Sequence, residues 1–384
     1  MSYRRASASL ALSCSLVFAC ADDDPSATTG GGGSGGATSG PTTTGATSVT
    51  NAVATSVSAT SASSTSGAGG GGGAPLTVAA CYEGQFVNPL VGGPDYDQFG
   101  PVVGSHCLGT NHQDIAAVER VVFVRASVTV GTPPTLSADY YRSKLADALG
   151  SKFNLGQPGF LWKSVNVFSG TANQQNDGAF AVCAKWGART DDLMADNTQI
   201  ESCIPPSQRD KTTLVVMTMG GNDIASLTQD AIDGVPMDQL WASTQAFVQH
   251  MEDTIAWLKE PGRFPNGVYV VFGNMYEFTD GTGEVQSCDV SALAGFAQPV
   301  PAPQELAAMV IWANEQYVRI AVDYQVDVTF MLEEFCGHGF ERDNPAAPCY
   351  RGPNQTAYFD LTCIHPTPAG HQHLKDMFFA VVDE

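Results

Sequence analysis

The stretch VVFVRASVTVGTPPT, from Val121 to Thr135, decides the fold. It begins with four consecutive apolar residues, a pattern typical of a strand buried on both faces of a sheet. Ser127 follows after Arg125 and Ala126, and a turn-rich segment with Gly131 and two prolines comes next. A serine at this position either presents its hydroxyl at the edge of a sheet or simply begins a turn. The rest of the chain decides between these two interpretations.

Similar apolar runs recur along the chain and alternate with helical patterns. The first predicted strand is 120–126, and the others are residues 180–185, 213–219, 267–273 and 326–332. The predicted helices are residues 136–153, 237–259, 304–323 and 367–382. Continuous β-branched runs that alternate with helices indicate parallel strands with helices on both faces. We therefore predict an α/β fold, a three-layer α/β/α sandwich around a five-stranded parallel sheet.

Polar residues and glycine follow successive predicted strands, where ligands bind in sheets of this kind. Ser127 comes after the first strand, Gly187 after the second in KWGARTDDL, and Asn222 after the third in MGGNDI. His365 lies near the C-terminus in FDLTCIHPTPAGH. Each of these residues alone also suits an ordinary turn or loop. Their order at successive strand ends is the informative observation.

These four blocks resemble the SGNH, or GDSL-type, esterase and lipase superfamily, from about residue 118 to residue 382. The resemblance implies a flavodoxin-like SGNH hydrolase fold and hydrolysis of carboxylic esters through an acyl-serine intermediate, without a cofactor or a metal. It assigns Ser127 as the nucleophile and His365 as the base. The oxyanion donors would be the backbone N–H groups of Ser127 and Gly187 and the side-chain amide of Asn222. Small esters, acylated glycans and lipids are the substrates that it implies.

The same assignment agrees with the chemistry of ester cleavage. The reaction needs an activated hydroxyl, a base that takes and returns its proton, and preorganised donors for the developing oxyanion. Gly187 suits a donor position because it has no Cβ to keep the backbone away from a substrate.

Two departures from the family pattern bear on activity. Where the family has Gly-Asp before the serine, this chain has Arg125 and Ala126, which leaves a non-catalytic binding protein of the same fold as an alternative. A structural surface lipoprotein is a third, less favoured hypothesis. The family's acid stands three residues before the histidine, and here that position is Thr362. We predict Asp360 as the acid instead.

Other arrangements of the acid stay open at this point. A bulge in the loop would be needed for Asp360 to reach the far ring nitrogen of His365. Without it, a backbone carbonyl would orient His365 in a Ser-His dyad. Glu333 and Glu334, after the fifth strand, are remote alternatives.

The N-terminal 75 residues have a different character. Residues 1–20 have a basic start and an apolar run from Leu10 to Ala19, and they end in Val-Phe-Ala-Cys, as a lipoprotein signal peptide does. We predict lipidation at Cys20. Residues 21–75 are rich in Gly, Ser and Thr and are expected to form a disordered tether. The predicted hydrolase-like domain is 76–384.

The charge balance excludes some partners. The chain has 18 Lys and Arg against 39 Asp and Glu, a formal net charge of −21, and removal of the signal peptide takes away two arginines. Such a surface repels nucleic acid, so we expect no nucleic-acid partner. We expect a monomer that is exported to the cell envelope or secreted, and that meets the membrane only through its lipid anchor.

Eight cysteines remain beyond the signal peptide, and an even number in an exported chain indicates disulfides. No C-x-x-C pair is present, which weakens a zinc or thioredoxin-like interpretation. Pairing of sequence neighbours is the simplest prediction. It gives Cys81–Cys107, Cys183–Cys203, Cys288–Cys336 and Cys349–Cys363.

Two further groups of polar residues have open interpretations. Asp95 and Asp97 in GGPDYDQFG form either a polar turn, which is favoured, or a Ca²⁺ loop. His371 and His373 are interpreted as helix-face residues without a role in catalysis.

Overall fold

The computed structural model describes residues 76–88, 93–124, 126–194 and 199–384. Residues 75–384 form one compact unit. The predicted signal peptide, the lipidation site Cys20, the tether and Arg125 lie outside the described residues. The first described helix is α1 (Val78–Tyr82).

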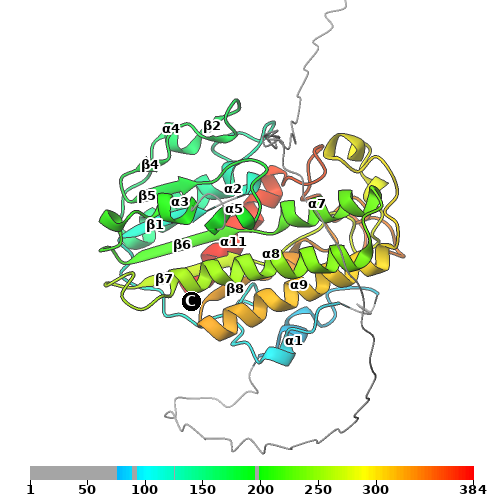
Figure 1. Cartoon of the computed structure of the whole chain (residues 1–384), viewed down its shortest axis with the longest axis horizontal. Helices are drawn as coiled ribbons and strands as arrows, with labels where there is room; N and C mark the ends of the chain where they lie inside the picture. The colour runs from blue at the N-terminus through cyan, green and yellow to red at the C-terminus, as the bar shows by residue number, and fades with distance from the viewer. Residues whose placement is uncertain (1–75, 89–92, 125, 195–198) are drawn as a thin grey trace, which may run out of the picture. The chain divides into compact units, whose positions relative to one another are not determined.

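A six-stranded sheet forms the centre of this unit, with the strand order β4-β5-β1-β6-β7-β8 (Figure 1). Five neighbouring strands run parallel: β5 (Phe180–Cys183), β1 (Arg120–Val124), β6 (Thr213–Thr218), β7 (Val268–Gly273) and β8 (Asp327–Thr329). They correspond to the five predicted strands. The sixth, β4 (Asn176–Asp177), pairs antiparallel with β5 at the edge. Sequence analysis missed it because two polar residues give no strand pattern.

Alternate residues of each strand face two different cores, which confirms the predicted three-layer α/β/α sandwich. In β1, Val122 and Val124 pack with α8 (Met237–Leu258) and α9 (Pro303–Tyr324). Val121 and Phe123 pack with α3 (Tyr141–Phe153) and α11 (Pro368–Asp383). Full burial of such a side chain stabilises the fold by about 1.5–3 kcal/mol. Figure 1 shows these two helix pairs on opposite sides of the sheet.

Shorter elements lie in the connections between the strands and the long helices. The predicted fifth strand ends at Thr329, and a helical turn follows where the prediction continued the strand. The remaining helices are α2 (Ser127–Val130), α4 (Phe160–Lys163), α5 (Asp191–Met194), α6 (Gln199–Cys203), α7 (Gly221–Ile232) and α10 (Met331–Phe335). A small hairpin pairs β2 (Val165–Asn166) with β3 (Thr171–Ala172), and the 3-10 turns are η1 (Asp97–Phe99), η2 (Pro206–Gln208), η3 (Val285–Ser287) and η4 (Ser291–Ala294).

Four disulfides cross-link the described chain, and two of them differ from the predicted pairs. Cys81–Cys107 and Cys183–Cys203 are present as predicted. The predictions Cys288–Cys336 and Cys349–Cys363 are wrong, because the structure contains Cys288–Cys363 and Cys336–Cys349. Neighbour pairing minimises loop length, but each doubling of a loop costs only about 0.6 kcal/mol. Packing decides instead, since Cys288 and Cys363 are both buried in the core that contains α3 and α11.

The two aspartates near residue 95 belong to a polar turn. Both carboxylate oxygens of Asp97 accept backbone N–H groups of Val78 and Ala79, at the start of α1. The backbone N–H of Asp95 donates to the Glu315 carboxylate on α9. Asp97 therefore caps a helix, which favours the polar turn over the Ca²⁺ loop.

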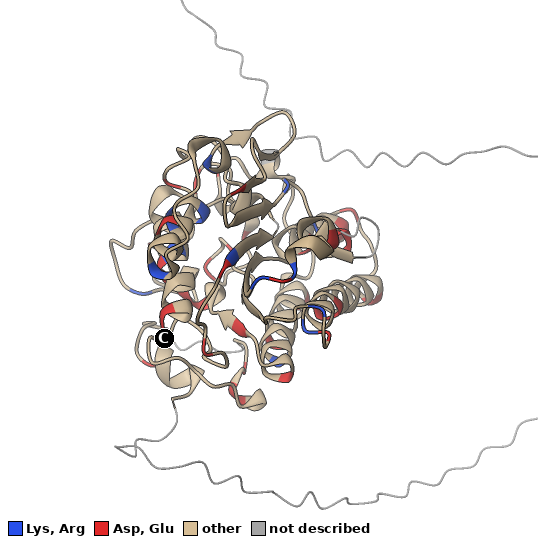
Figure 2. Cartoon of the chain, turned by 90° about the vertical axis from the view of Figure 1, so that its left-hand side faces the viewer, with Lys and Arg blue, Asp and Glu red and all other residues tan. Residues whose placement is uncertain are grey.

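The chain has 39 Asp and Glu against 18 Lys and Arg, and Figure 2 marks in red and blue where those in the described part lie along the backbone. In the part of the chain that the structure describes, no helix is long and apolar enough to cross a membrane. The four disulfides fit an extracellular or exported protein.

Candidate active site

Ser127 begins α2 directly after β1, at the carboxyl edge of the sheet. The preceding Ala126 has φ 69° and ψ 154°, an unusual backbone conformation for a residue with a Cβ. The backbone N–H groups of Thr129 and Val130 both donate to the Ala126 carbonyl, which closes the turn. This sharp turn lets the chain leave a buried strand and place the Ser127 hydroxyl at the sheet edge.

Further contacts hold the turn although the family's aspartate is replaced by Ala126. The hydroxyl of Thr129 lies 2.8 Å from that of Thr218 on β6 and 2.6 Å from that of Tyr141 on α3. The indole N–H of Trp186 donates to the carbonyl of Gly131. These contacts hold the C-terminal end of α2 and do not involve the side chain at position 126.

His365 meets Ser127 across the sheet edge, with 2.8 Å between its Nε2 and Ser127 Oγ. The two residues are 238 positions apart in the sequence. His365 is only 3% exposed, and its burial lowers the pKa of its imidazole to about 4. The ring is therefore neutral near pH 7, and a neutral ring nitrogen can accept the proton of a hydroxyl.

The loop that carries His365 is closed tightly. The backbone N–H of Asp360 donates to the His365 carbonyl at 2.9 Å, and that of Cys363 donates to the Asp360 carbonyl at 3.0 Å. Cys363 has a positive φ of 69° and is bonded to Cys288. The Tyr276 hydroxyl donates to the carbonyl of Ile364. Because backbone contacts and a disulfide hold this loop, the imidazole has a defined orientation.

Thr362, not Asp360, contacts the far nitrogen of the His365 ring. Thr362 Oγ1 lies 2.7 Å from His365 Nδ1 and donates to Asp360 Oδ1 at 2.6 Å. The structure thus brings Ser127, His365, Thr362 and Asp360 together in one chain of contacts. Sequence analysis assigned no role to Thr362, although its position three residues before the histidine was the signal that pointed to it.

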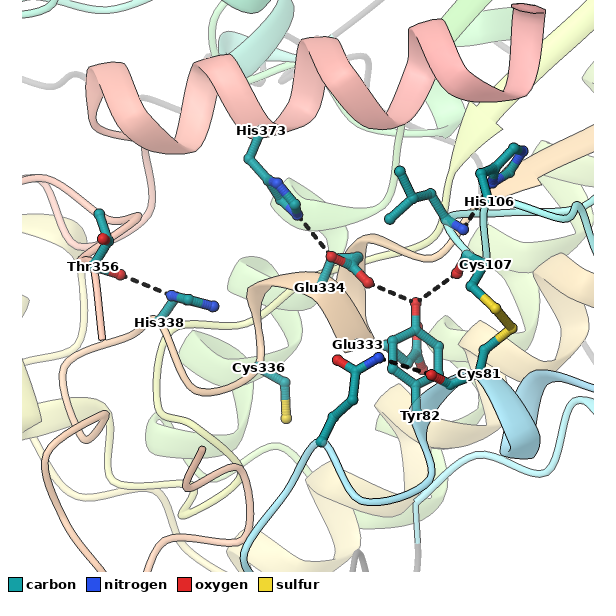
Figure 3. Close-up of polar contacts among 12 residues, drawn as sticks. Cys81, Tyr82, His106, Cys107, Glu333, Glu334, Cys336, His338, Thr356 and His373 are labelled. Atoms are coloured by element: carbon teal, nitrogen blue, oxygen red, sulfur yellow. Dashed lines mark hydrogen bonds and ion pairs between the residues drawn. A yellow bond between two sulfur atoms is a disulfide. The ribbon is translucent and has the colours of Figure 1, made fainter. Parts of the chain in front are cut away.

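The two remote alternatives for the acid have other partners (Figure 3). Glu334 on α10 lies 2.8 Å from Nε2 of His373 on α11, and it accepts the Tyr82 hydroxyl at 3.0 Å. Glu333 accepts an amide N–H of Asn274. His373 therefore has a structural contact that the sequence did not indicate.

The neighbouring His371 is buried and packs against the start of α3. Its Nδ1 accepts the backbone N–H of Tyr141 at 3.2 Å, and its ring packs against the rings of Tyr140 and Tyr141. Burial lowers its pKa to about 3, so it is a neutral core side chain rather than a surface residue of α11.

Gly187 lies in the loop after β5, and a hydrogen bond joins this loop to Asn222 in the first turn of α7. The side-chain amide of Asn222 donates to the carbonyl of Ala188 at 2.8 Å, and the same nitrogen carries a second N–H. Buried Asp223 accepts the backbone N–H and the hydroxyl of Thr190. Gly187 has φ +74°, and a Cβ added there would meet nothing within 4 Å. This positive φ is a backbone conformation that favours glycine.

A cavity of about 370 Å³ opens beside Ser127 and Asn222. Most of its wall is apolar and comes from α7, α9 and the segments after β7 and β8. Among the described lining residues there is no Lys or Arg, and the carboxyl groups are those of Glu277 and Glu333. Prominent apolar lining residues are Ile224, Met275, Phe278, Phe296, Leu306 and Val310.

Comparisons with known proteins give a likeness in structure alone. No protein-family model and no curated protein matches the sequence. An extracellular lipase from Streptomyces rimosus is similar over 68% of this chain and 99% of its own, with 17% identity and a TM-score of 0.39. A lipase from a goat rumen metagenome is similar over 68% of this chain and 96% of its own, with 13% identity and a TM-score of 0.44. A gut microbial diltiazem-metabolizing enzyme is similar over 69% of this chain and 47% of its own, with 13% identity and a TM-score of 0.42.

Proposed function

We propose that this protein is an exported serine esterase of the SGNH type, which hydrolyses carboxylic esters through an acyl-Ser127 intermediate. The observation that carries the proposal is the 2.8 Å contact between Ser127 Oγ and His365 Nε2, at the carboxyl edge of a parallel sheet. A serine that only begins a turn has no need of a buried, neutral imidazole as its partner. An apolar cavity that Ser127 itself lines supplies space for an acyl group.

In the proposed reaction, Ser127 Oγ attacks the ester carbonyl carbon while its proton passes to His365 Nε2. The carbonyl oxygen becomes an oxyanion that the N–H groups of Ser127, Gly187 and Asn222 stabilise. The carbon–oxygen bond to the alcohol then breaks, and His365 returns the proton to the departing alcohol. Water repeats the sequence on the acyl-enzyme, which releases the acid and restores Ser127. No step draws on a cofactor.

The cavity supports neutral esters with an apolar acyl group as substrates. Its wall carries apolar side chains and, among the described lining residues, no Lys or Arg, so an acyl chain that ends in a carboxylate would lose its hydration there without a cationic partner. Acylated glycans and acylglycerols both offer such neutral esters. The net charge of −21 disfavours anionic lipids.

Lipid anchoring at Cys20, with residues 21–75 as a tether, belongs to the same proposal. Four disulfides support passage through an oxidising compartment. A Cys20→Ser variant of the full chain is expected to leave the membrane fraction. Retention of this variant in that fraction after a high-salt wash would exclude the anchor.

A fluorophosphonate probe tests the proposed chemistry. It reacts with an activated serine because the serine oxygen displaces fluoride from phosphorus. We expect the full chain to be labelled and Ser127→Ala to be unlabelled, with circular dichroism showing that both are folded. Absence of labelling of the folded wild type would exclude a serine hydrolase and favour the non-catalytic binding protein. Labelling of Ser127→Ala would place the nucleophile elsewhere.

A further inference from the structure

The Thr362 hydroxyl has three polar neighbours, and their chemistry fixes its proton. Oγ1 lies 2.6 Å from Asp360 Oδ1, 2.7 Å from His365 Nδ1 and 3.3 Å from the backbone nitrogen of His365. A hydroxyl has one hydrogen to donate and two lone pairs to accept with. An ionised carboxylate only accepts, and a backbone N–H only donates. The hydroxyl hydrogen therefore points to Asp360, and one lone pair takes the backbone N–H of His365.

The remaining lone pair of Thr362 faces His365 Nδ1, so this nitrogen carries a hydrogen. In a neutral imidazole only one nitrogen is protonated, which leaves Nε2 as an acceptor. That nitrogen is the one 2.8 Å from Ser127 Oγ. The contacts of a single threonine thus select the tautomer in which His365 can take the proton of Ser127.

We propose that Thr362 is a positioning residue that transmits the negative charge of Asp360 to His365, so that the site works as a four-residue relay, Ser127–His365–Thr362–Asp360. The inference rests on the proposed function and adds a member to its machinery. When His365 becomes an imidazolium in the transition state, its Nδ1–H bond to the hydroxyl strengthens, because the hydroxyl is polarised by the carboxylate behind it. Thr362 does not touch the substrate or the reacting atoms.

The loop is built to hold this relay in place. Asp360 Oδ1 also accepts the backbone N–H of Thr362 at 2.8 Å, which fixes the carboxylate beneath the hydroxyl. The Cys288–Cys363 disulfide anchors the next residue to the core. Asp360 Oδ2 is buried without a hydrogen-bond partner among the described residues. The carboxylate is therefore held by the hydrogen bonds that it accepts from the hydroxyl and the backbone N–H of Thr362.

Protonation of Asp360 would reverse the relay. A neutral carboxyl group can donate to Thr362, whose hydroxyl hydrogen is then able to turn toward His365 Nδ1. Nε2 would carry the imidazole hydrogen, and it could no longer accept from Ser127. The titratable groups that face Asp360 are Tyr276, from the segment after β7, and His365 from its own loop. Burial raises the pKa of Asp360, so the active arrangement is present above this raised pKa and is lost as the pH falls through it.

Kinetics of the full chain with a neutral p-nitrophenyl ester test the relay. Thr362→Val removes the hydroxyl with little change of volume, and we expect a fall in kcat of roughly 10²-fold with KM almost unchanged. Thr362→Ser keeps the hydroxyl and should retain kcat within about fivefold. Asp360→Asn should lose about as much as Thr362→Val, and the double variant should lose no more than either single variant, because the two residues act as a unit.

Two results would overturn the relay. One is a Thr362→Val variant that keeps at least a third of the wild-type kcat; the other is a double variant whose losses multiply. Since Thr362→Val could fail to fold, the tautomer of His365 is to be measured in wild type by ¹⁵N NMR of labelled histidines, assigned with His365→Gln. Hydrogen on Nδ1 at about pH 7 supports the relay. Hydrogen on Nε2 contradicts it, even if the wild type proves to have no esterase activity.

Discussion

Ser127 Oγ and His365 Nε2 lie 2.8 Å apart, although 238 positions separate the two residues in the sequence. Ser127 is held by the turn that ends β1, and His365 by a loop that a disulfide ties to the core. The contact therefore joins two independently fixed elements. Each of the following predictions changes one part of this arrangement.

Removal of the Asn222 amide is expected to weaken stabilisation of the oxyanion. Asn222→Ala should lower kcat by about 10²–10³-fold with a small change in KM, because the lost hydrogen bond forms mainly in the transition state. Steady-state kinetics with a p-nitrophenyl ester measure this. Thr228→Val is the matched control, since Thr228 also lines the cavity but bonds its hydroxyl to the Ile224 carbonyl within α7. Equal losses in both variants would argue against a donor role for Asn222.

The acidic limb of the activity profile should lie well below the ordinary pKa of histidine. His365 must be neutral to accept a proton, and burial lowers its pKa to about 4. Activity is therefore present above that pKa and declines as the pH falls through it. The pH dependence of kcat/KM reports the free enzyme. A limb near pH 6.5 that persists in Asp360→Asn would mean that His365 is not the buried, uncharged base described here.

The two buried histidines should contribute to the pH dependence of stability. Burial lowers the pKa of His365 to about 4 and that of His371 to about 3, so the unfolded chain binds protons near pH 6 that the folded chain excludes. The contribution of these two histidines to the free energy of unfolding therefore rises with pH between about 4 and 6.5, whereas that of Asp280 and Glu333, whose pKa burial raises to about 7, falls over the same range. Urea unfolding at several pH values measures the slope. His371→Gln should lower this slope relative to wild type, and an unchanged slope would contradict a buried, neutral His371.

Loss of the Cys288–Cys363 disulfide should affect both stability and catalysis. It closes a loop with a sequence separation of 75, which corresponds to about 4 kcal/mol in the chain-entropy model. Replacement of both cysteines by alanine should also lower kcat, because Cys363 belongs to the loop that orients His365. The control removes Cys81–Cys107, which should lower the free energy of unfolding but leave kcat unchanged. Similar kcat losses for the two pairs would contradict an orienting role.

A bulky residue in the cavity should limit the substrates to esters with shorter acyl chains. Val310 lines the cavity from α9, and Val310→Trp would fill part of its 370 Å³. We expect kcat/KM for an octanoate ester to fall at least tenfold, while that for an acetate ester changes by less than about threefold. Equal effects on both esters would show that acyl chains occupy another surface.

Most of the fold and the ends of the active-site strands could be predicted from the sequence. Buried parallel strands appear in a sequence as continuous apolar runs. The sheet edge near Ser127, Gly187 and Asn222 could therefore be predicted. The two-residue strand β4 was not, since its residues are polar and its pairing depends on β5. The helix after Thr329 was missed because apolar residues at a strand end also suit a helix.

The role of Thr362 and two of the disulfides could not be predicted for a common reason. The disulfide pairs depend on contacts that are distant in sequence, and the contacts of Thr362 depend on the loop conformation that one of these disulfides helps to fix. The positive φ of Cys363 and its bond to Cys288 bend the loop so that Thr362 lies between Asp360 and His365. Neither sequence spacing nor residue type determines such a bend.

The acyl-enzyme itself offers the most direct measurement. The full chain is to be mixed with p-nitrophenyl butyrate, quenched during turnover and digested, and the peptide that contains Ser127 examined by mass spectrometry. The predicted result is a butyryl group on Ser127 that disappears once substrate is exhausted and that never forms in Ser127→Ala. Turnover of the ester with the butyryl group on another residue, or with Ser127→Ala fully active, would contradict the assignment of Ser127 as the nucleophile.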